Sequence, residues 1–521
     1  MPAPPELRAG VFTPHMLVEA LNRDTERAVL HMADGRIMTA GEMRDVLSTY
    51  LQAFEELGIR PGTRVGLLSK NRPEVMHAFN AASVGRLCIV PMHPMGSLDD
   101  YLYMMDDAGI EVLIYDPTSF DEQAAALKRG TPGLKHLLAF GPTRVGRDLE
   151  ALAARHAPRP LVAPVVRADE VSRLSYSGGT TGKPKAIMTT NLSAWYTLVI
   201  MMAEWEWPAE IRHLVCAPLS HAGAAAFLPT LLRGGSLVVL PAFEPVAVLE
   251  AIERHRITSA IMVPTMIYAL LGHPRFAEFD LSSLETIFYG ASSISPTRLK
   301  EAIERIGPVF FQFYGQAEAP MTVTVLKKRE HDPSNLARLA SCGRPVPWVG
   351  VALLDDRGRE VPDGVPGEIC VRGPLLMAGY LNKPQQTAEA FQGGWLHTGD
   401  VAVKDPDGFL RIVDRKKDMI VTGGFNVFPR EVEDVLSSHP AVASAAVIGV
   451  ADEKWGEAVK AVVVLRPNAS VAAEELISLV REKKGAVQAP KSVDFIDSIP
   501  LSGLGKPDKK ALRARYARAK T

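Results

Sequence analysis

The stretch Ser175–Ile187, which reads SYSGGTTGKPKAI, concentrates residue types that can bind phosphate. Glycine lets backbone N–H groups approach an oxyanion closely, hydroxyls donate hydrogen bonds, and lysines supply positive charge. The residues of these three kinds are Ser177, Gly178, Gly179, Thr180, Thr181, Gly182, Lys183 and Lys185. The stretch therefore predicts a phosphate-binding loop.

Two other interpretations of this loop have to be weighed. The nucleotidase phosphate loop has the spacing G-x-x-x-x-G-K-[ST], which would need glycine at Ser177 and a hydroxyl residue at Pro184. Both positions fail, so the spacing argues against a nucleotidase. The remaining interpretation is a glycine-rich turn between a strand and a helix that binds nothing.

Further motifs follow the loop in a fixed order. They read PLSHAGAAAF, FYGASSIS, QFYGQAE, GEICVRGPLLMAGYLN, WLHTGD, DGFLRIVDRKKD, GGFNVFPREVE and IPLSGLGKPDKKALR. Together with the loop, this order resembles the adenylate-forming (ANL) superfamily, which includes acyl-CoA synthetases, luciferases and nonribosomal adenylation domains. The resemblance runs from about Thr39 to the C-terminus and points to the acyl-CoA synthetase (AMP-dependent synthetase and ligase) family.

The resemblance implies an ATP-dependent acyl-CoA synthetase. In the family's reaction a carboxylate and ATP give acyl-AMP and pyrophosphate, and a nucleophile then takes the acyl group. Adenylation is needed because the oxygen of a free carboxylate is a poor leaving group. The implied cofactors are ATP, Mg²⁺ and coenzyme A, and the implied partner is a small-molecule carboxylic acid.

The resemblance also assigns roles to single residues. The loop from Ser177 to Lys185 would hold the β and γ phosphates, Glu318 would bind Mg²⁺, and Asp400 with Arg415 would bind the ribose. The residues expected along the adenine and the α-phosphate are Gly290, Ala291, Gln312, Tyr314 and Gly315. Tyr314 could stack on the adenine, but taken alone it is better explained as a core aromatic residue at a strand end.

Lys506, in LGKPDKK, is the expected catalytic lysine, which bridges the carboxylate and the α-phosphate during adenylation only. Lys417 matches the family hinge, about which the C-terminal domain rotates after adenylation. That rotation would bring in the GGFNVFP segment, where Gly423 and Gly424 would flank the pantetheine arm and Asn426 would contribute to the same binding segment.

The chain departs from the family pattern at three positions. Ala186 stands where the loop usually has glycine, and Ala317 where a threonine usually contacts the α-phosphate. Gln316 is the candidate to replace the lost hydrogen bond. Val421 stands where some relatives have lysine. The first two departures motivate a rival hypothesis, a binding protein that keeps the fold but lacks turnover.

The acyl pocket and the acceptor are less constrained by the sequence. His221 is expected to close the pocket, and the small residues Gly223 to Ala226 indicate either room for a bulky acyl group or tight helix packing. We see no aspartate for an α-amine, which argues against an amino-acid substrate. Coenzyme A is the expected acceptor. An amide-forming ligase that uses an amine is the alternative, and luciferase-type oxygenation is a third outcome.

The pattern of apolar segments predicts an α/β fold. Segments such as RVGLLSK, RLCIVPM, SLVVLPA, ITSAIMV and VFFQFYG alternate with helical ones, which indicates doubly wound parallel sheets covered on both faces. The helical segment TAGEMRDVLSTYLQAFEELG opens with the capping-box pair Thr39 and Glu42 and is stopped by Gly58.

We predict a large N-terminal domain, 1–414, with two α/β subdomains and a β-rich subdomain at about 341–414. A small, mobile α+β domain, 415–521, follows. The charged run DRKKD, 414–418, is expected to be a solvent-exposed linker between them.

Net charge, cysteine content and the length of apolar runs limit the classes of function that the chain can have. The chain has 521 residues, a formal net charge of -1 and 22% charged residues, so no global field favours nucleic acid. Four dispersed cysteines show neither metal-ligand spacing nor a disulfide framework, which suits a reducing cytoplasm. No apolar run is long enough for an integral membrane segment. The basic end RARYARAK is expected to be a solvated helix end, with a patch for an anionic ligand as the alternative. The sequence does not indicate an oligomeric state.

Overall fold

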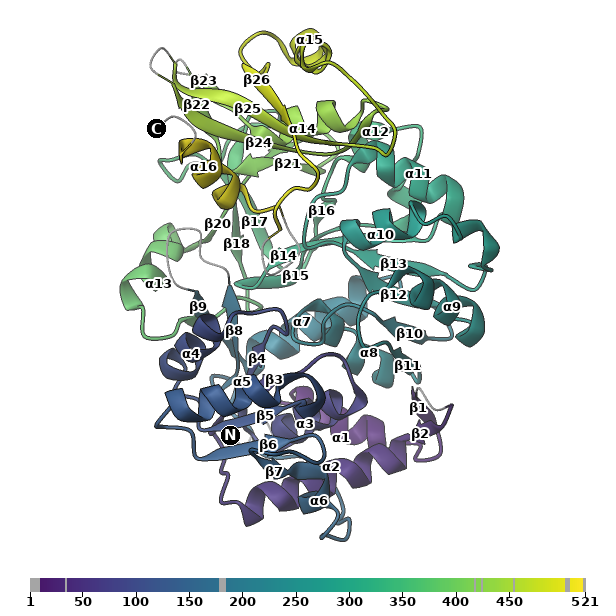
Figure 1. The fold of residues 1–521 in the computed structure, drawn as a ribbon. Coiled ribbons are helices and arrows are strands. Elements are labelled where there is room, and N and C mark those ends of the chain that lie inside the picture. The colour runs from purple at the N-terminus through teal and green to yellow at the C-terminus, as the bar shows by residue number, and fades with distance from the viewer. Residues whose placement is uncertain are drawn as a thin grey trace, which may run out of the picture. The chain divides into compact units, whose positions relative to one another are not determined.

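The computed structural model describes residues 10–32, 35–177, 184–416, 418–422, 425–452, 455–501 and 507–518. The chain forms two compact units (Figure 1). Unit 1 comprises Met1–Ala291, Val309–Val323 and Gly373–Glu389, and unit 2 comprises Ser292–Pro308, Thr324–Arg372 and Ala390–Thr521. Each unit is described by itself below.

The first sheet of unit 1 has eight strands in the order β19-β9-β8-β4-β3-β5-β6-β7. The strands are β3 (Arg64–Leu68), β4 (Cys88–Met92), β5 (Val112–Tyr115), β6 (His136–Ala139), β7 (Arg147–Asp148), β8 (Val171–Ser177), β9 (Lys185–Thr190) and β19 (Gly379–Tyr380). From β8 to β7 all neighbours are parallel, whereas β9 runs antiparallel to both β8 and β19.

Helices cover both faces of this sheet, because alternate strand residues point to opposite sides. In β5, Val112 and Ile114 enter one hydrophobic cluster, while Leu113 and Tyr115 enter another. The first cluster contains residues of α1 (Thr13–Asn22), α2 (Ala40–Glu56), α3 (Pro73–Val84) and α6 (Leu149–Ala153). The second contains residues of α4 (Leu98–Asp107) and α5 (Pro117–Gly130).

The start of α2 confirms the predicted capping box. The Thr39 side chain accepts from the Glu42 N–H, and the Glu42 carboxylate accepts from the Thr39 N–H at 2.8 Å. Gly58, just past the helix end, has a φ of +71°, a conformation that glycine adopts without steric cost.

The second sheet of unit 1 has the order β14-β13-β12-β10-β11-β1-β2. These strands are β1 (Ala28–His31), β2 (Ile37–Thr39), β10 (Arg212–Val215), β11 (Ser236–Val239), β12 (Ser259–Met262), β13 (Thr286–Tyr289) and β14 (Phe310–Gln316). All neighbours from β14 to β1 are parallel, and β2 is antiparallel to β1. The sheet continues into β15 (Ala319–Leu326), which begins in unit 1 and ends in unit 2.

The remaining helices of unit 1 follow these strands or lie in its last segment. They are α7 (Asn191–Glu204), η2 (Ala222–Ala224), α8 (Phe227–Leu232), α9 (Pro245–His255), α10 (Pro264–Leu271), η3 (Phe276–Glu278) and α13 (Pro384–Ala390). The strand and helix alternation therefore confirms the predicted doubly wound α/β fold.

Unit 2 contains a β-rich part, as predicted. Its antiparallel sheet has the order β17-β18-β20-β21. The elements are β16 (Arg344–Pro345), β17 (Gly350–Leu354), β18 (Gly367–Arg372), β20 (Leu396–Lys404), β21 (Leu410–Arg415), α11 (Pro296–Ile306), α12 (Leu336–Leu339), η4 (Lys328–Glu330) and η5 (Gln392–Gly394).

The C-terminal part of unit 2 is the predicted α+β arrangement. Its five-stranded sheet has the order β23-β22-β25-β24, with β26 paired to β25. The elements are β22 (Ile420–Thr422), β23 (Phe425–Val427), α14 (Pro429–Ser437), β24 (Val442–Asp452), β25 (Gly456–Leu465), α15 (Ala473–Lys484), β26 (Ser492–Phe495) and α16 (Lys509–Arg518).

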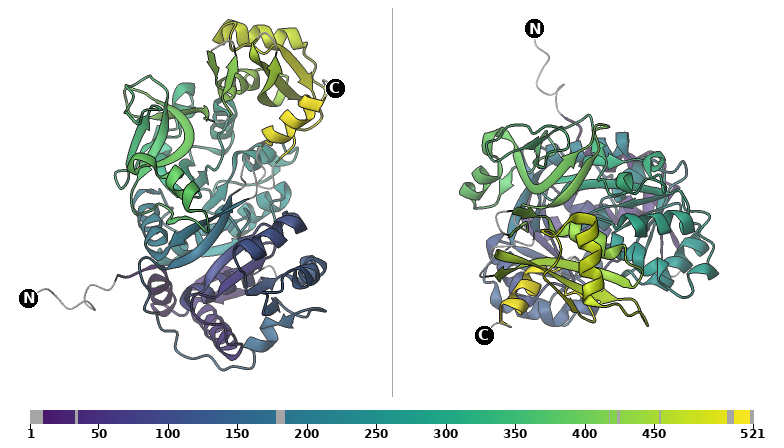
Figure 2. Two further views of the ribbon diagram at one scale, coloured as in Figure 1. Left: turned by 90° about the vertical axis from the view of Figure 1, so that its left-hand side faces the viewer. Right: turned by 90° about the horizontal axis from the view of Figure 1, so that it is seen from above.

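Helices lie on both faces of this C-terminal sheet (Figure 2), and a hydrophobic cluster fills the space on each face. Residues of α14 and α15 pack with Val447 and Val459 on one face. Leu512 of α16 packs with Ile448 and Val462 on the other. Successive strand residues thus bury opposite sides, which fixes the register of β24 on β25.

One expectation about a charged segment was wrong at Asp414. In the DRKKD run, Asp414 is 6% exposed and accepts the Arg430 N–H at 2.9 Å, so this residue is not part of an exposed linker. The basic C-terminal end is helical, its described residues from Arg513 on are half-buried or exposed, and Arg513 pairs with Asp418 at 3.0 Å. The pair of Arg513 with Asp418 attaches the C-terminal helix to the DRKKD run, and the contact of Asp414 with Arg430 attaches the run to α14, all within unit 2.

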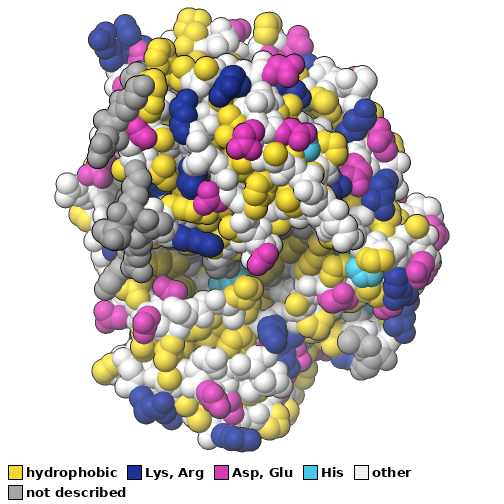
Figure 3. Space-filling view, turned by 45° about the horizontal axis from the view of Figure 1, so that its top comes forward, with side chains coloured by type: hydrophobic (Ala, Val, Ile, Leu, Met, Phe, Trp, Pro, Cys, Tyr) yellow, Lys and Arg dark blue, Asp and Glu magenta, His cyan; other side chains and the backbone are white. Residues whose placement is uncertain are grey.

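The surface carries mixed charge. On the face shown in Figure 3, basic and acidic side chains of the described residues are interspersed, which matches the formal net charge of -1. Within the described residues, every helix is too short or too polar to cross a bilayer.

A buried histidine predicts how stability depends on pH. His213 on β10 is 1% exposed, its Nδ1 lies 2.9 Å from the Ser259 hydroxyl, and burial lowers its pKa to about 3. In the unfolded chain the imidazole has its ordinary pKa near ~6.5. Only the unfolded state then binds the proton as the pH falls below about 6.5, so stability is lost at up to about 1.4 kcal/mol per pH unit.

The measurement is equilibrium urea unfolding between pH 7.5 and 5. The unfolding free energy should change less steeply with pH in His213→Gln than in the wild type. The difference in slope should correspond to the uptake of nearly one proton on unfolding. The slope should stay as in the wild type in the control His273→Gln, a partly exposed position outside the regular elements. Equal slopes in the wild type and His213→Gln would contradict this assignment.

Candidate active site

The predicted phosphate loop joins two antiparallel strands. Ser177, the last residue of β8, is the register partner of Lys185, the first residue of β9. Helix α7 begins only at Asn191, so the alternative of a turn between a strand and a helix was wrong. Gly178, Gly179, Thr180, Thr181, Gly182 and Lys183, and the side chain of Ser177, lie outside the described residues.

Ala186 sits inside this hairpin rather than in the loop. It is 0% exposed and packs in the hydrophobic cluster that contains Leu174 of the adjacent strand. A methyl group therefore has a structural place at this position, where the family usually has glycine.

Glu318, Tyr380 and Lys185 form a polar cluster in unit 1. Glu318 lies in the turn between β14 and β15, and its Oε1 accepts the Tyr380 hydroxyl at 3.0 Å. The Lys185 Nζ lies 4.8 Å from the centre of the Tyr380 ring. Tyr380 reaches this place because it pairs with Ile187 of β9. One tyrosine thus connects the end of the phosphate loop to the predicted metal ligand.

The electrostatics keep Tyr380 protonated. Burial, together with the charge and hydrogen bond of Glu318, raises the pKa of Tyr380 well above its usual range. The hydroxyl therefore remains a hydrogen-bond donor to the carboxylate throughout the neutral range. Tyr380 lies in the GYLN motif, and the sequence alone predicted no role for it.

Close backbone approach explains two predicted nucleotide-binding glycines. A Cβ at Gly290 would lie 2.4 Å from the Phe313 carbonyl oxygen, and one at Gly315 would lie 2.3 Å from the Met321 nitrogen. Ala291 has a φ of +65°, in the left-handed region that non-glycine residues rarely adopt. These residues lie at the carboxyl ends of the parallel strands β13 and β14, the edge where open α/β sheets bind ligands.

Gln312 and Tyr314 lie on the same strand, β14. Gln312 is buried, and its Oε1 accepts the Tyr289 hydroxyl at 3.4 Å. Tyr314 is half-buried. Ala317 is exposed in the turn that follows, next to half-buried Gln316.

His221 opens the short 3₁₀-helix η2. Its Nδ1 lies 3.0 Å from the Ser220 hydroxyl, and its ring stands edge-on to His93 at 4.9 Å between centroids. A Cβ at Gly223 would lie 2.2 Å from the Ala217 carbonyl oxygen, and Ala226 is 0% exposed. Tight packing therefore accounts for these two small residues.

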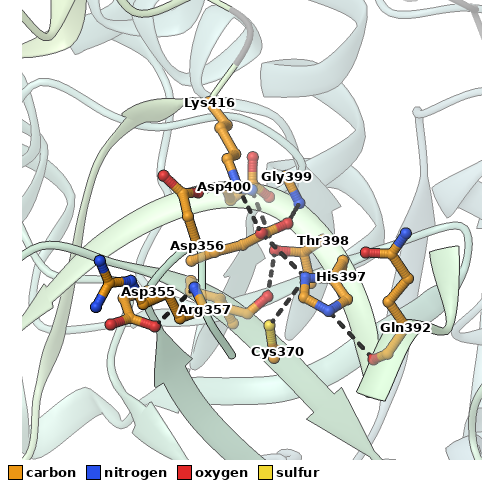
Figure 4. A network of polar contacts seen from close by, with 12 residues as sticks. Asp355, Asp356, Arg357, Cys370, Gln392, His397, Thr398, Gly399, Asp400 and Lys416 are labelled. Carbon is orange, nitrogen blue, oxygen red and sulfur yellow. Dashed lines mark hydrogen bonds and ion pairs between the residues drawn. The ribbon is translucent and has the colours of Figure 1, made fainter. Parts of the chain in front are cut away.

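Asp400 and Arg415 form a cross-strand pair in unit 2. They are register partners on β20 and β21, and the Arg415 Nε lies 2.9 Å from the Asp400 Oδ1. The Asp400 side chain is 6% exposed, and that of Arg415 is 43% exposed. The motif T-G-D does not form the predicted turn. Gly399, with a φ of +71°, lies within β20 (Figure 4), at an irregularity in the register of β20 with β18.

Several predicted residues cannot be placed. Lys506, Lys417, Gly423 and Gly424 lie outside the described residues, as does the side chain of Asn426. Their predicted roles remain predictions. Val421, where some relatives carry lysine, lies on β22 and is 46% exposed.

Comparison with known families agrees with this arrangement. Residues 17–381 match the AMP-binding enzyme family, and residues 431–506 match the AMP-binding enzyme C-terminal domain. The chain therefore belongs to the AMP-binding enzymes, and its predicted place in the adenylate-forming superfamily, among the acyl-CoA synthetases, is confirmed.

The chain is also similar, over most of its length, to individual proteins of this family. The chain is 53% identical to the medium/long-chain-fatty-acid–CoA ligase FadD8 of Mycobacterium tuberculosis, over 98% of this chain and 91% of the relative. It is 38% identical to a feruloyl-CoA synthase of Amycolatopsis sp, over 92% and 94%. The solved structure of the amide bond synthetase McbA from Marinactinospora thermotolerans superposes with a TM-score of 0.88 at 33% identity, over 96% and 99%.

The contact between Tyr380 and Glu318 can be tested by titration. Replacing Glu318 by Gln removes the negative charge, so the pKa of Tyr380 should fall, yet stay above its usual value because burial is the largest cause of the shift. Tyrosine-labelled ¹³C NMR between pH 8 and 12 measures this, with Tyr380→Phe assigning the resonance.

Tyr176 is the internal control. Its pKa is also raised, first by burial and then by its hydrogen bond to Asp107, so it should not respond to Glu318→Gln. An unchanged Tyr380 titration in Glu318→Gln would show that the two groups are not coupled.

Proposed function

We propose that the protein activates a carboxylic acid with ATP as acyl-AMP and then transfers the acyl group to coenzyme A. It is an AMP-forming acyl-CoA ligase. The observation that carries the site assignment is the polar cluster of Lys185, Tyr380 and Glu318 at the end of the β8–β9 hairpin. The cluster joins Lys185, the first residue of β9, through Tyr380 to the Glu318 carboxylate, which supports a role for this end of the hairpin in phosphate binding.

The triphosphate would be held by the loop Ser177–Lys185. Backbone N–H groups and hydroxyls neutralise the phosphate oxygens, and Lys185 adds charge. Glu318 fits a Mg²⁺ ion, because Tyr380 occupies Oε1 and the carboxylate has a second oxygen of the hard type that Mg²⁺ prefers. When bound, Mg²⁺ would offset the charge of the phosphates.

The nucleoside would be held by the groups already described. Gly290 and Ala291, after β13, would lie along the adenine and the α-phosphate together with Gln312, Tyr314 and Gly315 of β14. In unit 2 the Asp400 carboxylate would accept the ribose hydroxyls, with Arg415 holding it in place.

The proposed catalytic step uses Lys506. Its ammonium would steady the carboxylate oxygen as that oxygen attacks the α-phosphorus and pyrophosphate leaves. Residues 415–521 would then rotate about Lys417 as a small domain. Gly423, Gly424 and Asn426 would line the path of the pantetheine arm, whose thiol attacks the acyl carbon and releases AMP.

We propose an apolar acid as the substrate. The similarity to FadD8 and to a feruloyl-CoA synthase favours medium- to long-chain fatty acids and arylpropenoic acids. His221, whose ring packs on that of His93, would close the acyl pocket. The reaction is proposed to take place in the cytoplasm.

An amide-forming ligase is the second candidate. The structural similarity to the amide bond synthetase McbA favours it. Both candidates share the adenylation step and differ only in the nucleophile, so product analysis with coenzyme A and amines in parallel separates them.

The proposed reaction predicts its products, and the ribose assignment of Asp400 predicts weaker use of ATP by the variant Asp400→Asn. With fatty and aromatic acids, ATP, Mg²⁺ and coenzyme A, chromatography should show AMP, pyrophosphate and acyl-CoA. Asp400→Asn should raise the KM for ATP about 10- to 100-fold, because a hydrogen bond to a charged group is worth about 1.5–3 kcal/mol.

Asp407→Asn is the matched control for this measurement. Asp407 is an exposed carboxylate that pairs with Arg338 in unit 2, so its KM for ATP should match the wild type. ADP as the product would overturn the proposed reaction, and an unchanged KM in Asp400→Asn would overturn the ribose assignment.

The two half-reactions should respond differently to Lys506→Ala. Adenylation should fall by at least about a thousandfold, since the ammonium is proposed to act only in that transition state. Thioester formation from supplied acyl-AMP should stay within about threefold of the wild type. Stopped-flow assays of each half-reaction measure this, and equal losses in both would contradict the assigned role.

A further inference from the structure

Three side chains of unit 2 that the proposed function does not use meet on the β-rich sheet (Figure 4). Glu368 and Cys370 are two residues apart on β18, so they share one face of the strand, and His397 of β20 is the register partner of Cys370. The His397 Nδ1 lies 3.0 Å from the Glu368 Oε2 and 3.5 Å from the Cys370 Sγ. Three chemically different metal-ligand atoms therefore converge.

Hydrogen bonding fixes which ring nitrogen of His397 faces the point where they converge. The His397 Nε2 faces the Gln392 carbonyl oxygen at 3.2 Å, and a carbonyl can only accept, so Nε2 carries hydrogen. In a neutral ring Nδ1 then holds a lone pair directed at a carboxylate. The Cys370 thiol can donate to this lone pair, and a metal ion that displaced the thiol proton would use the same lone pair.

We propose that Glu368, Cys370 and His397 form a binding site for a thiophilic divalent cation of the Zn²⁺ class. The geometry suits tetrahedral coordination, in which Zn–S and Zn–N bonds of about 2.3 and 2.0 Å place the two ligand atoms about 3.5 Å apart. The Cys370 and His397 atoms are 3.5 Å apart. The His397 side chain is 24% exposed, so a water molecule can complete the fourth position.

Neighbouring groups already hold the ligands in place. The Gly399 N–H donates to the Glu368 Oε1 at 2.9 Å, which leaves Oε2 to face the site. The Gln392 carbonyl fixes the His397 tautomer that presents Nδ1. Such outer contacts orient metal ligands and raise metal affinity.

The nearby lysine does not block a cation. The Lys416 Nζ lies 3.4 Å from the Glu368 Oε2 but only 2.7 Å from an Asp356 carboxylate oxygen, so Asp356 neutralises it. With a Cys370 thiolate, a dication balances the two remaining negative charges. On binding, the ion replaces the thiol proton of Cys370 and any proton on the His397 Nδ1, and these protons pass to water.

The same cluster does not suit nucleophilic chemistry. Cys370 is 0% exposed, and burial, with the charge of Glu368, raises the pKa of its thiol to about 12. A reactive cysteine needs access and a stabilised thiolate, and this one has neither without a metal. The proposal is independent of the ligase reaction.

The test uses the full chain, freed of nucleotide and metal, with Zn²⁺ alone as the ligand. Competition with a chromophoric chelator should show one Zn²⁺ per chain, and Co²⁺ should give a near-ultraviolet thiolate-to-metal band. Cys370→Ser and His397→Ala should each lower the affinity more than about 100-fold and abolish the band.

His439→Ala is the matched control, because His439 contacts Glu475 at 3.2 Å as His397 contacts Glu368, and no cysteine is grouped with that pair among the described residues. It should keep both the stoichiometry and the band. Equal Zn²⁺ affinity in the wild type and His397→Ala, or a wild-type Co²⁺ spectrum without the thiolate band, would overturn the proposal. If the core variant Cys370→Ser fails to fold, His397→Ala still tests the proposal, because His397 is only half-buried.

Discussion

The pairing of β9 with strands on both of its sides is the constraint on which the polar cluster of unit 1 depends. On one side β8 brings Ser177 opposite Lys185, which closes the hairpin whose loop carries the glycines. On the other side β19 brings Tyr380 opposite Ile187 and so within 3.0 Å of Glu318. Backbone ladders therefore set where Lys185 and Tyr380 stand on this sheet, and the Tyr380 hydroxyl makes the contact to Glu318.

The surroundings of β9 and of Glu318 show which departures from the family pattern affect the site. Ala186 fills part of the core behind β9, so it does not argue against phosphate binding. Ala317 is exposed beside Glu318 and lacks the hydroxyl that relatives have there. Only this second change removes a polar group from the site, which weakens the case for a fold that has lost its reaction.

Local patterns predicted the elements well, because they depend on neighbours in sequence. The capping box at Thr39 and the alternating strands of the C-terminal sheet are examples. The contact of Tyr380 with Glu318 joins residues 62 positions apart, and that of Cys370 with His397 joins residues 27 apart. Such contacts depend on strand register between distant segments, which a single sequence does not specify.

Gly399 makes two of the long-range contacts of unit 2 with its own backbone. Its N–H bonds to Glu368, its carbonyl accepts the Lys416 N–H at 2.8 Å, and its φ of +71° suits glycine. A side chain here would meet open space, but it would strain the backbone by about 1 kcal/mol, and any backbone shift that relieved the strain would move both hydrogen bonds. For anyone who diversifies this enzyme toward new acids or nucleotides, the residue is best left out of the mutagenised library.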